Sequence, residues 1–135
     1  MSSPHNKTYR ASDFRFEATI GSGAFGQVRL AYHPIEDEWR AIKVMTKAEL
    51  IALVDLALAE VVLLRNVKHP FIVDLIATFH DDKRLYLILE FLRGGDLRRR
   101  LSKMTRLPPA DAQFYAAQLL CALDYLHEAN VLYRN

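Results

Sequence analysis

The stretch Gly21-Ser22-Gly23-Ala24-Phe25-Gly26-Gln27-Val28 decides the fold, because three glycines at this spacing permit a tight turn. Glycine has no Cβ, so the backbone N–H groups of such a turn can approach a phosphate closely. The same spacing also occurs in dinucleotide-binding folds and in ordinary glycine-rich turns. The residues on either side of the glycines therefore have to separate these possibilities.

Strand patterns flank the glycines on both sides. Residues 14–20 alternate apolar and polar side chains, and residues 27–32 do the same before the chain reaches His33-Pro34. A dinucleotide-binding unit would instead begin a helix inside the motif. We therefore expect the glycines to join two strands of a hairpin, which disfavours an NAD-dependent oxidoreductase. A plain glycine hairpin that binds nothing is the alternative at this point.

Two charged residues lie in apolar surroundings further along the chain. Residues 39–45 predict a third strand, and Lys43 lies on its apolar face. Residues 47–67 have helical spacing, and every neighbour of Glu60 three, four or seven positions away is apolar. An unpaired carboxylate is costly to bury, so Glu60 is expected to pair with a cation, and Lys43 is the obvious partner. A lysine that reaches solvent at a strand edge is the alternative.

The rest of the sequence predicts more strands, followed by helices. Residues 71–80 and 84–90 form a second hairpin across the turn 81–83, which makes five strands in all. A connector at 91–96 leads to a helix at 108–129, whose apolar residues cover most of its circumference. Such a helix belongs in the centre of something larger, so we expect further protein, in the same fold or in a partner, to bury it.

Composition excludes several classes of protein. The 135 residues are 51% hydrophobic and 25% charged, with a net charge of +2, which disfavours disorder and a strongly electrostatic partner. Arg98-Arg99-Arg100 is interpreted as a solvated helix face rather than a nucleic-acid site, because no aromatic residues interleave it. The histidines lack metal-ligand spacing, so no metal site is assigned.

The cellular environment is inferred from the same composition. The single cysteine, Cys121, lies in an apolar helix and fits a reducing compartment. Residues 1–11 lack the apolar core of a signal peptide, and the most hydrophobic run, 50–64, is too short to span a membrane. We expect a cytoplasmic protein without membrane association.

Taken in order, these motifs resemble those of a eukaryotic protein kinase. Residues 21–28 match the glycine-rich loop, Ala41-Ile42-Lys43 matches the A-x-K strand, and Glu60 matches the helix C glutamate. The chain is most similar to the AGC serine/threonine group, close to the cyclic-AMP-dependent protein kinases. The resemblance covers nearly all of the chain from residue 14. The supporting stretches are 85–91, 94–97, 114–119, 125–127 and 132–134.

The resemblance implies an α+β fold of two parts. After a flexible leader at 1–13, residues 14–90 would form a kinase N-lobe with a five-stranded antiparallel sheet and helix C. Residues 91–135 would form the hinge and the first helices of an incomplete C-lobe. ATP and magnesium are the implied cofactors. The implied nucleotide-binding residues are Ile20, Gly21, Ser22, Gly23, Ala24, Phe25, Gly26, Val28, Ala41, Lys43, Leu89 as gatekeeper, Glu90, Leu92 and Asp96.

The resemblance also implies a role for each group. Lys43, aligned by Glu60, would reach the α- and β-phosphates in the catalytic arrangement. Backbone groups of Glu90 and Leu92 would hydrogen-bond the adenine edge, while Val28 and Ala41 would sandwich its ring. Asp96 would contact the ribose or a substrate arginine. An aspartate at this place is equally suited to cap the N-terminus of the following helix.

The resemblance runs out at Tyr133-Arg134-Asn135. The family continues Tyr-Arg-Asp, then Leu-Lys-Pro-Glu-Asn and later Asp-Phe-Gly. Asn135 thus stands at the position of the catalytic aspartate, inside the catalytic loop, and an amide cannot accept the substrate proton. Both magnesium ligands of the family are also absent from these residues. We therefore expect weak nucleotide binding without turnover from this chain.

The expected parent activity is ATP-dependent phosphorylation of serine or threonine in protein substrates. The alternative is a non-catalytic, pseudokinase-like protein that binds or regulates a kinase-related partner. The apolar helix at 108–129 is the feature on which that alternative depends.

Overall fold

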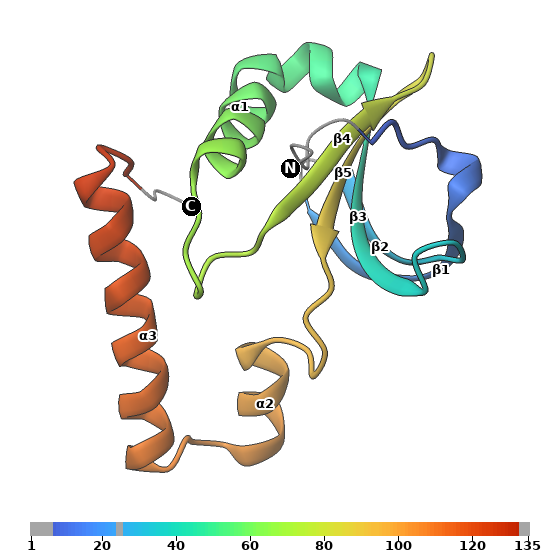
Figure 1. Cartoon of the computed structure of the whole chain (residues 1–135). Helices are drawn as coiled ribbons and strands as arrows, with labels where there is room; N and C mark the ends of the chain where they lie inside the picture. Colours follow the sequence, from blue (N-terminus) through green and yellow to red (C-terminus); the bar gives the residue numbers. More distant parts are fainter. Residues whose placement is uncertain (1–6, 24–25, 133–135) are drawn as a thin grey trace. The chain divides into compact units, whose positions relative to one another are not determined.

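The computed structural model describes residues 7–23 and 26–132, with all of their side chains except those of 49, 50 and 52–57. The chain divides into two compact units. The first contains Met1–Asn66 and Asp74–Phe91, and the second contains Val67–Val73 and Leu92–Asn135. The first unit is a sheet with one long helix, and the second is built around two helices (Figure 1).

The first unit holds one five-stranded antiparallel sheet in the order β1-β2-β3-β5-β4. The predicted α+β class and five-stranded antiparallel sheet are confirmed. The strands are β1 (Arg15–Gly23), β2 (Gly26–His33), β3 (Glu38–Thr46), β4 (Leu75–His80) and β5 (Arg84–Glu90).

The fourth strand is shorter than the sequence predicted. The expected strand over 71–80 is wrong for residues 71–74, since pairing with β5 begins only at Leu75. The N–H of Ile72 donates to the carbonyl of His69 at 3.0 Å and closes a turn. An apolar run at 71–73 looks like a strand by composition, but this turn takes its backbone out of the ladder.

Helix α1 (Lys47–Asn66) covers one face of the sheet (Figure 1). Its 20 residues contain no glycine or proline, which favours an uninterrupted helix, and Pro70 follows soon after its end. Val61 of α1 is buried against Met45 and Leu87 of the sheet. Among the described side chains these contacts form the smaller of two core clusters, and Leu64, Leu75 and Leu85 pack around it.

Aromatic rings form the core on the opposite face of the sheet. The ring of Phe79 stacks on Phe14 with centroids 6.2 Å apart and on Tyr86 with centroids 4.4 Å apart. Ile42 and Ile88 lie beneath them and are fully buried. Because neighbouring residues of a strand point to opposite faces, the residues on either side of Ile42 face α1.

The second unit contains α2 (Leu97–Met104) and α3 (Pro109–Glu128). A short connection joins them (Figure 1), and Arg100 donates to Asp111 at 2.8 Å across it. The segment 67–73 belongs to the same unit. The contacts that attach it to α3 are a hydrogen bond from the Lys68 N–H to the Tyr125 hydroxyl at 3.1 Å and a ring contact between His69 and Tyr125 at 5.1 Å.

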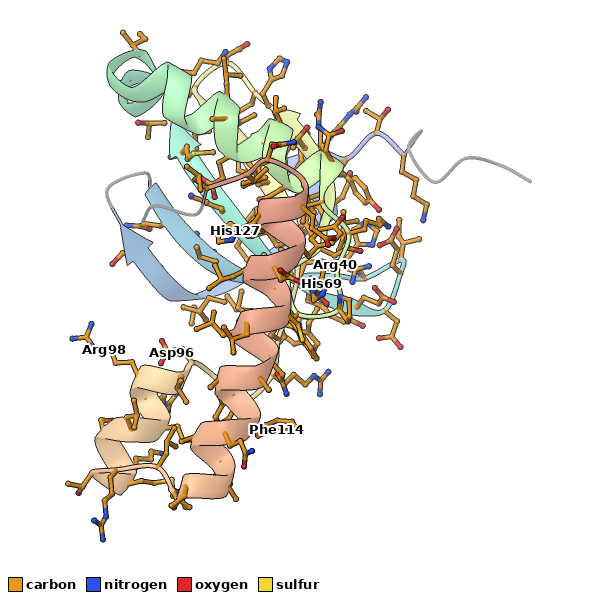
Figure 2. All side chains as sticks on the ribbon, turned by 90° about the vertical axis from the view of Figure 1, so that its left-hand side faces the viewer. Arg40, His69, Asp96, Arg98, Phe114 and His127 are labelled. Carbon is orange, nitrogen blue, oxygen red and sulfur yellow. The ribbon has the colours of Figure 1, made fainter. Side chains whose placement is uncertain are left out.

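Apolar side chains of α3 are left uncovered by the residues that the structure describes. Only Ala122 and Leu126 of this helix are buried. Phe114, Leu119 and Leu120 are 61%, 61% and 66% exposed, and Phe114 projects from the side of the helix (Figure 2). Over the described ranges, no helix combines the length and the apolar character that crossing a bilayer requires.

Residues 7–13 pack against the sheet, although the sequence assigned them to a flexible leader. The ring of Tyr9 contacts those of Phe14 and His33, with centroids 5.7 and 5.6 Å apart. The Tyr9 hydroxyl donates to Glu36 at 2.9 Å, and Lys7 Nζ donates to the same carboxylate at 2.6 Å. The sequence did not predict this attachment, because polar residues of this kind usually indicate a solvated segment, whereas here the charged and phenolic groups make the contacts themselves.

Glu36 is therefore a junction between the N-terminal segment and the β2–β3 turn. Burial alone would raise the pKa of its carboxyl, but the hydrogen bonds from Lys7 and Tyr9 and the nearby His33 lower the pKa to about 2. A carboxyl whose pKa falls on folding stabilises the folded state above its ordinary pKa and loses that effect as the pH falls toward the lowered value.

We predict that Glu36→Gln reduces the free energy of unfolding by about 3 kcal/mol at pH 7. The difference from the unmodified chain narrows by about half at pH 3, because the carboxyl of the unfolded chain then binds a proton while most of the native carboxyl stays ionised. Urea unfolding at the two pH values measures this. Glu17→Gln on β1 is the control, and a gap between Glu36→Gln and the unmodified chain that is equal at both pH values contradicts the prediction.

Candidate functional site

Lys43 of β3 and Glu60 of α1 form an ion pair inside the first unit. Lys43 Nζ lies 2.8 and 2.7 Å from the two carboxylate oxygens of Glu60. The two side chains are 16% and 34% exposed, so water screens the pair only in part. The predicted pairing is confirmed. The alternative of a lysine at a strand edge is wrong, because β3 lies between β2 and β5.

Small and apolar side chains surround Lys43 on its face of the sheet. The register places Val28 opposite Lys43, Lys43 opposite Leu87, and Ala41 opposite Leu89. Directly opposed residues of antiparallel strands point to the same face, so all five share the face covered by α1. An apolar surface beside a held cation suits a ligand that combines a flat base with phosphates.

The glycines join β1 and β2 as a hairpin, as predicted, and no helix begins at the residues of this motif that the structure describes. The register pairs Gly21 with Val28, Ser22 with Gln27, and Gly23 with Gly26. Ile20, the residue before the first glycine, is 47% exposed. Two further predicted binding residues, Ala24 and Phe25, lie outside the residues that the structure describes.

Gly26 and Gly23 differ in what a side chain would meet. Gly26 has φ +107°, which side chains rarely permit, and a Cβ there would lie 2.1 Å from the carbonyl oxygen of Val44. Apart from its chain neighbours, no atom of the described residues lies within 4 Å of the Cβ position of Gly23. Glycine is therefore required at position 26 by the close approach of β3, whereas Gly23 leaves the open space that a ligand at the turn would need.

Glu90, at the end of β5, uses its N–H within the protein. This N–H donates to the carbonyl of Asp74 at 3.1 Å, and the N–H of Asp74 donates back to the Glu90 carboxylate at 2.9 Å. Any adenine contact by the backbone of Glu90 is therefore restricted to its carbonyl oxygen. Sequence reasoning missed Asp74, because no local pattern links residues that are 16 positions apart.

Leu92 and Asp96, two predicted binding residues, belong to the second unit. Leu92 is 61% exposed. The carboxylate of Asp96 accepts a hydrogen bond from the N–H of Arg99 at 2.7 Å and caps the N-terminus of α2. The capping interpretation of Asp96 is thus confirmed, and its contact with ribose or substrate stays a prediction.

The predicted position of the catalytic aspartate, Asn135, lies outside the described residues. Across 7–23 and 26–132, no group of three or more His, Cys, Asp or Glu side chains is arranged to hold a metal ion.

A glycine hairpin, a strand lysine paired with a helix glutamate, and this strand order are consistent with the N-lobe of a protein kinase. The chain belongs to the protein kinase family, whose kinase domain matches residues 14–135. It is 41% identical over 129 residues to a cAMP-dependent protein kinase catalytic subunit of Arthrobotrys oligospora, covering 94% of the chain and 25% of that protein.

The chain is also similar to the serine/threonine-protein kinases Sgk1-A of Xenopus laevis and Sgk1 of Homo sapiens. The identities are 40% and 39% over 137 residues, covering 99% of the chain and 31% of each relative. These relatives place the chain in the AGC group, as the motifs predicted. The chain spans about a quarter to a third of the length of the relatives.

We predict that Gly26→Ala lowers the free energy of unfolding by about 2 kcal/mol or more, since its Cβ meets the Val44 carbonyl. The corresponding fall in Tm is roughly 5–10 °C. Gly23→Ala is the matched control with little expected effect, because no described residue beyond its chain neighbours approaches its Cβ position. Thermal unfolding by circular dichroism measures both variants, and an equal fall in Tm contradicts the prediction.

Proposed function

We propose that this chain is the nucleotide-binding part of a protein serine/threonine kinase that phosphorylates proteins with Mg-ATP. The observation that carries the proposal is the ion pair of Lys43 and Glu60, with 2.7 Å between Nζ and the nearer oxygen. Family membership supports it, because kinases use such a lysine to neutralise nucleotide phosphates.

The residues of the first unit fit an ATP molecule by their chemistry. Bound Mg-ATP supplies the γ-phosphoryl group that is transferred. Lys43 would hold the α- and β-phosphates, and Glu60 keeps its ammonium in place. Val28 and Ala41 would pack against the adenine, and the carbonyl of Glu90 would accept a hydrogen bond from its amino group.

We also propose that the 135 residues by themselves bind ATP without transferring phosphate. Asn135 stands where the family has its catalytic aspartate, and no residue of this sequence matches the two magnesium ligands of the family. Phosphoryl transfer depends mainly on positioning and on stabilising charge, so the loss of these groups leaves no efficient route.

Substitution of the ion pair tests the nucleotide site. We predict that Lys43→Ala raises the Kd for a fluorescent ATP analogue at least tenfold, which corresponds to a loss of about 1.4 kcal/mol of binding free energy. Glu60→Gln weakens it less, because the ammonium remains but is no longer held. Lys83→Ala, in the turn before β5, is the matched control and leaves the Kd unchanged. If all three variants bind like the unmodified chain, Lys43 does not contact the nucleotide.

A phosphotransfer assay tests the second proposal. The chain is incubated with Mg-ATP and a basic peptide that contains serine, with Lys43→Ala as the background control. We predict that both proteins give the same signal, since neither supplies a base or the magnesium ligands. Turnover above the Lys43→Ala background would falsify the proposal that the chain is catalytically inactive, whatever the result for ATP binding.

The alternative function is a non-catalytic protein that binds or regulates a kinase-related partner. The exposed apolar residues Phe114, Leu119 and Leu120 of α3 favour it, because a surface of this kind is usually covered. Absence of ATP affinity, together with a stable complex in size-exclusion chromatography, would select this alternative.

A further inference from the structure

Helix α2 and its flanks carry a concentrated positive charge. Between residues 93 and 106 the sequence has six basic residues and one acidic residue, Asp96. The carboxylate of Asp96 is already used to cap α2, and Asp111 is paired with Arg100. The basic residues, all exposed, are Arg93, Arg98, Arg99, Arg100, Lys103 and Arg106.

Ser102 is an exposed nucleophile inside this cationic segment. Its hydroxyl donates to the carbonyl of Arg99 at 2.8 Å, one turn back in the same helix. Residues three and four positions apart share a helix face, so Arg98 and Arg99 are its neighbours on the helix surface. Arg98 extends away from α2 (Figure 2). The serine is therefore exposed on a helix face that also carries two arginines.

Helix α2 is also poorly held in place. None of its eight residues is buried. Its C-cap residue, Thr105, has φ +62°, a conformation that is strained for a side chain branched at Cβ. Elements without buried contacts open locally at low free energy, so the segment around Ser102 can leave the helix and enter a kinase groove. Arg98, Arg99 and Arg100 stay within four positions of Ser102 when the helix opens.

We propose that Ser102 is a phosphorylation site for an arginine-directed serine/threonine kinase. Such a kinase presents carboxylates to the substrate, and arginine pairs with carboxylates through two parallel hydrogen bonds. In the reaction, the Ser102 oxygen bonds to the γ-phosphorus of ATP and the bond from that phosphorus to ADP breaks. The hydroxyl proton passes to the base of the kinase and then to water.

The phosphate changes the surface on which it is placed. The formal charge of residues 93–106 falls from +5 to about +3, because phosphoserine carries nearly two negative charges. The last turn of a helix disfavours an anion, so the neighbouring arginines have to supply the compensating hydrogen bonds. The proposal goes beyond the proposed function, since a separate kinase performs the transfer and the chain is its substrate.

Mass spectrometry of the full 135-residue chain tests the proposal. The chain carries Lys43→Ala, which removes any transfer by its own nucleotide site, and is incubated with Mg-ATP and a purified arginine-directed kinase. Cleavage before aspartates releases residues 96–110 as one peptide, whose hydroxyl side chains are Ser102 and Thr105. We expect one phosphate on this peptide, lost in Ser102→Ala and kept in Thr105→Ala.

Charge variants test the role of the arginines. Arg98→Gln with Arg99→Gln is expected to slow the modification at least about tenfold, because two charge-assisted contacts are lost. Arg15→Gln with Arg84→Gln on the sheet is the matched control with an unchanged rate. The proposal is overturned if the phosphate lies on Thr105, if it forms only on a synthetic 96–110 peptide, or if both double variants react at the same rate.

Discussion

The ion pair between Lys43 and Glu60 is the constraint on which the arrangement of the first unit depends. Each charge is partly buried, so each would destabilise the fold without the other. The pair joins a central strand to the helix packed on it, and the two residues are 17 positions apart in the chain. Its geometry is therefore satisfied only when α1 lies on the correct face of the sheet and β3 is in its observed register.

Much of this arrangement was predictable from local patterns. Alternation of side chains located four of the strands, and the absence of a helix signal after Gly26 identified a hairpin. The partner of Glu60 followed from a physical necessity rather than from a pattern, because a carboxylate among apolar neighbours needs a cation. Lys43 was the suitable cation on an adjacent element, so one contact at long range was predictable.

The features that escaped prediction depend on contacts between distant, polar residues. The attachment of Tyr9 and Lys7 to Glu36 spans 27 and 29 positions, and its residues look solvated in the sequence. The two hydrogen bonds between Asp74 and Glu90 could not be predicted from the sequence either, because their donors are backbone N–H groups, which nearly every residue type has. The predicted start of β4 at residue 71 was too early, because apolar composition does not reveal a turn.

The two faces of β3 serve different purposes, and this makes the strand sensitive to changes in length. Ile42 is fully buried in the aromatic core, while the next residue, Lys43, points to the opposite face. One inserted or deleted residue before this point would exchange the two faces, sending the ammonium among aromatic rings. A point substitution in β3 changes one side chain of the site or of the core, whereas a one-residue shift of the strand register would disrupt the core and the site together.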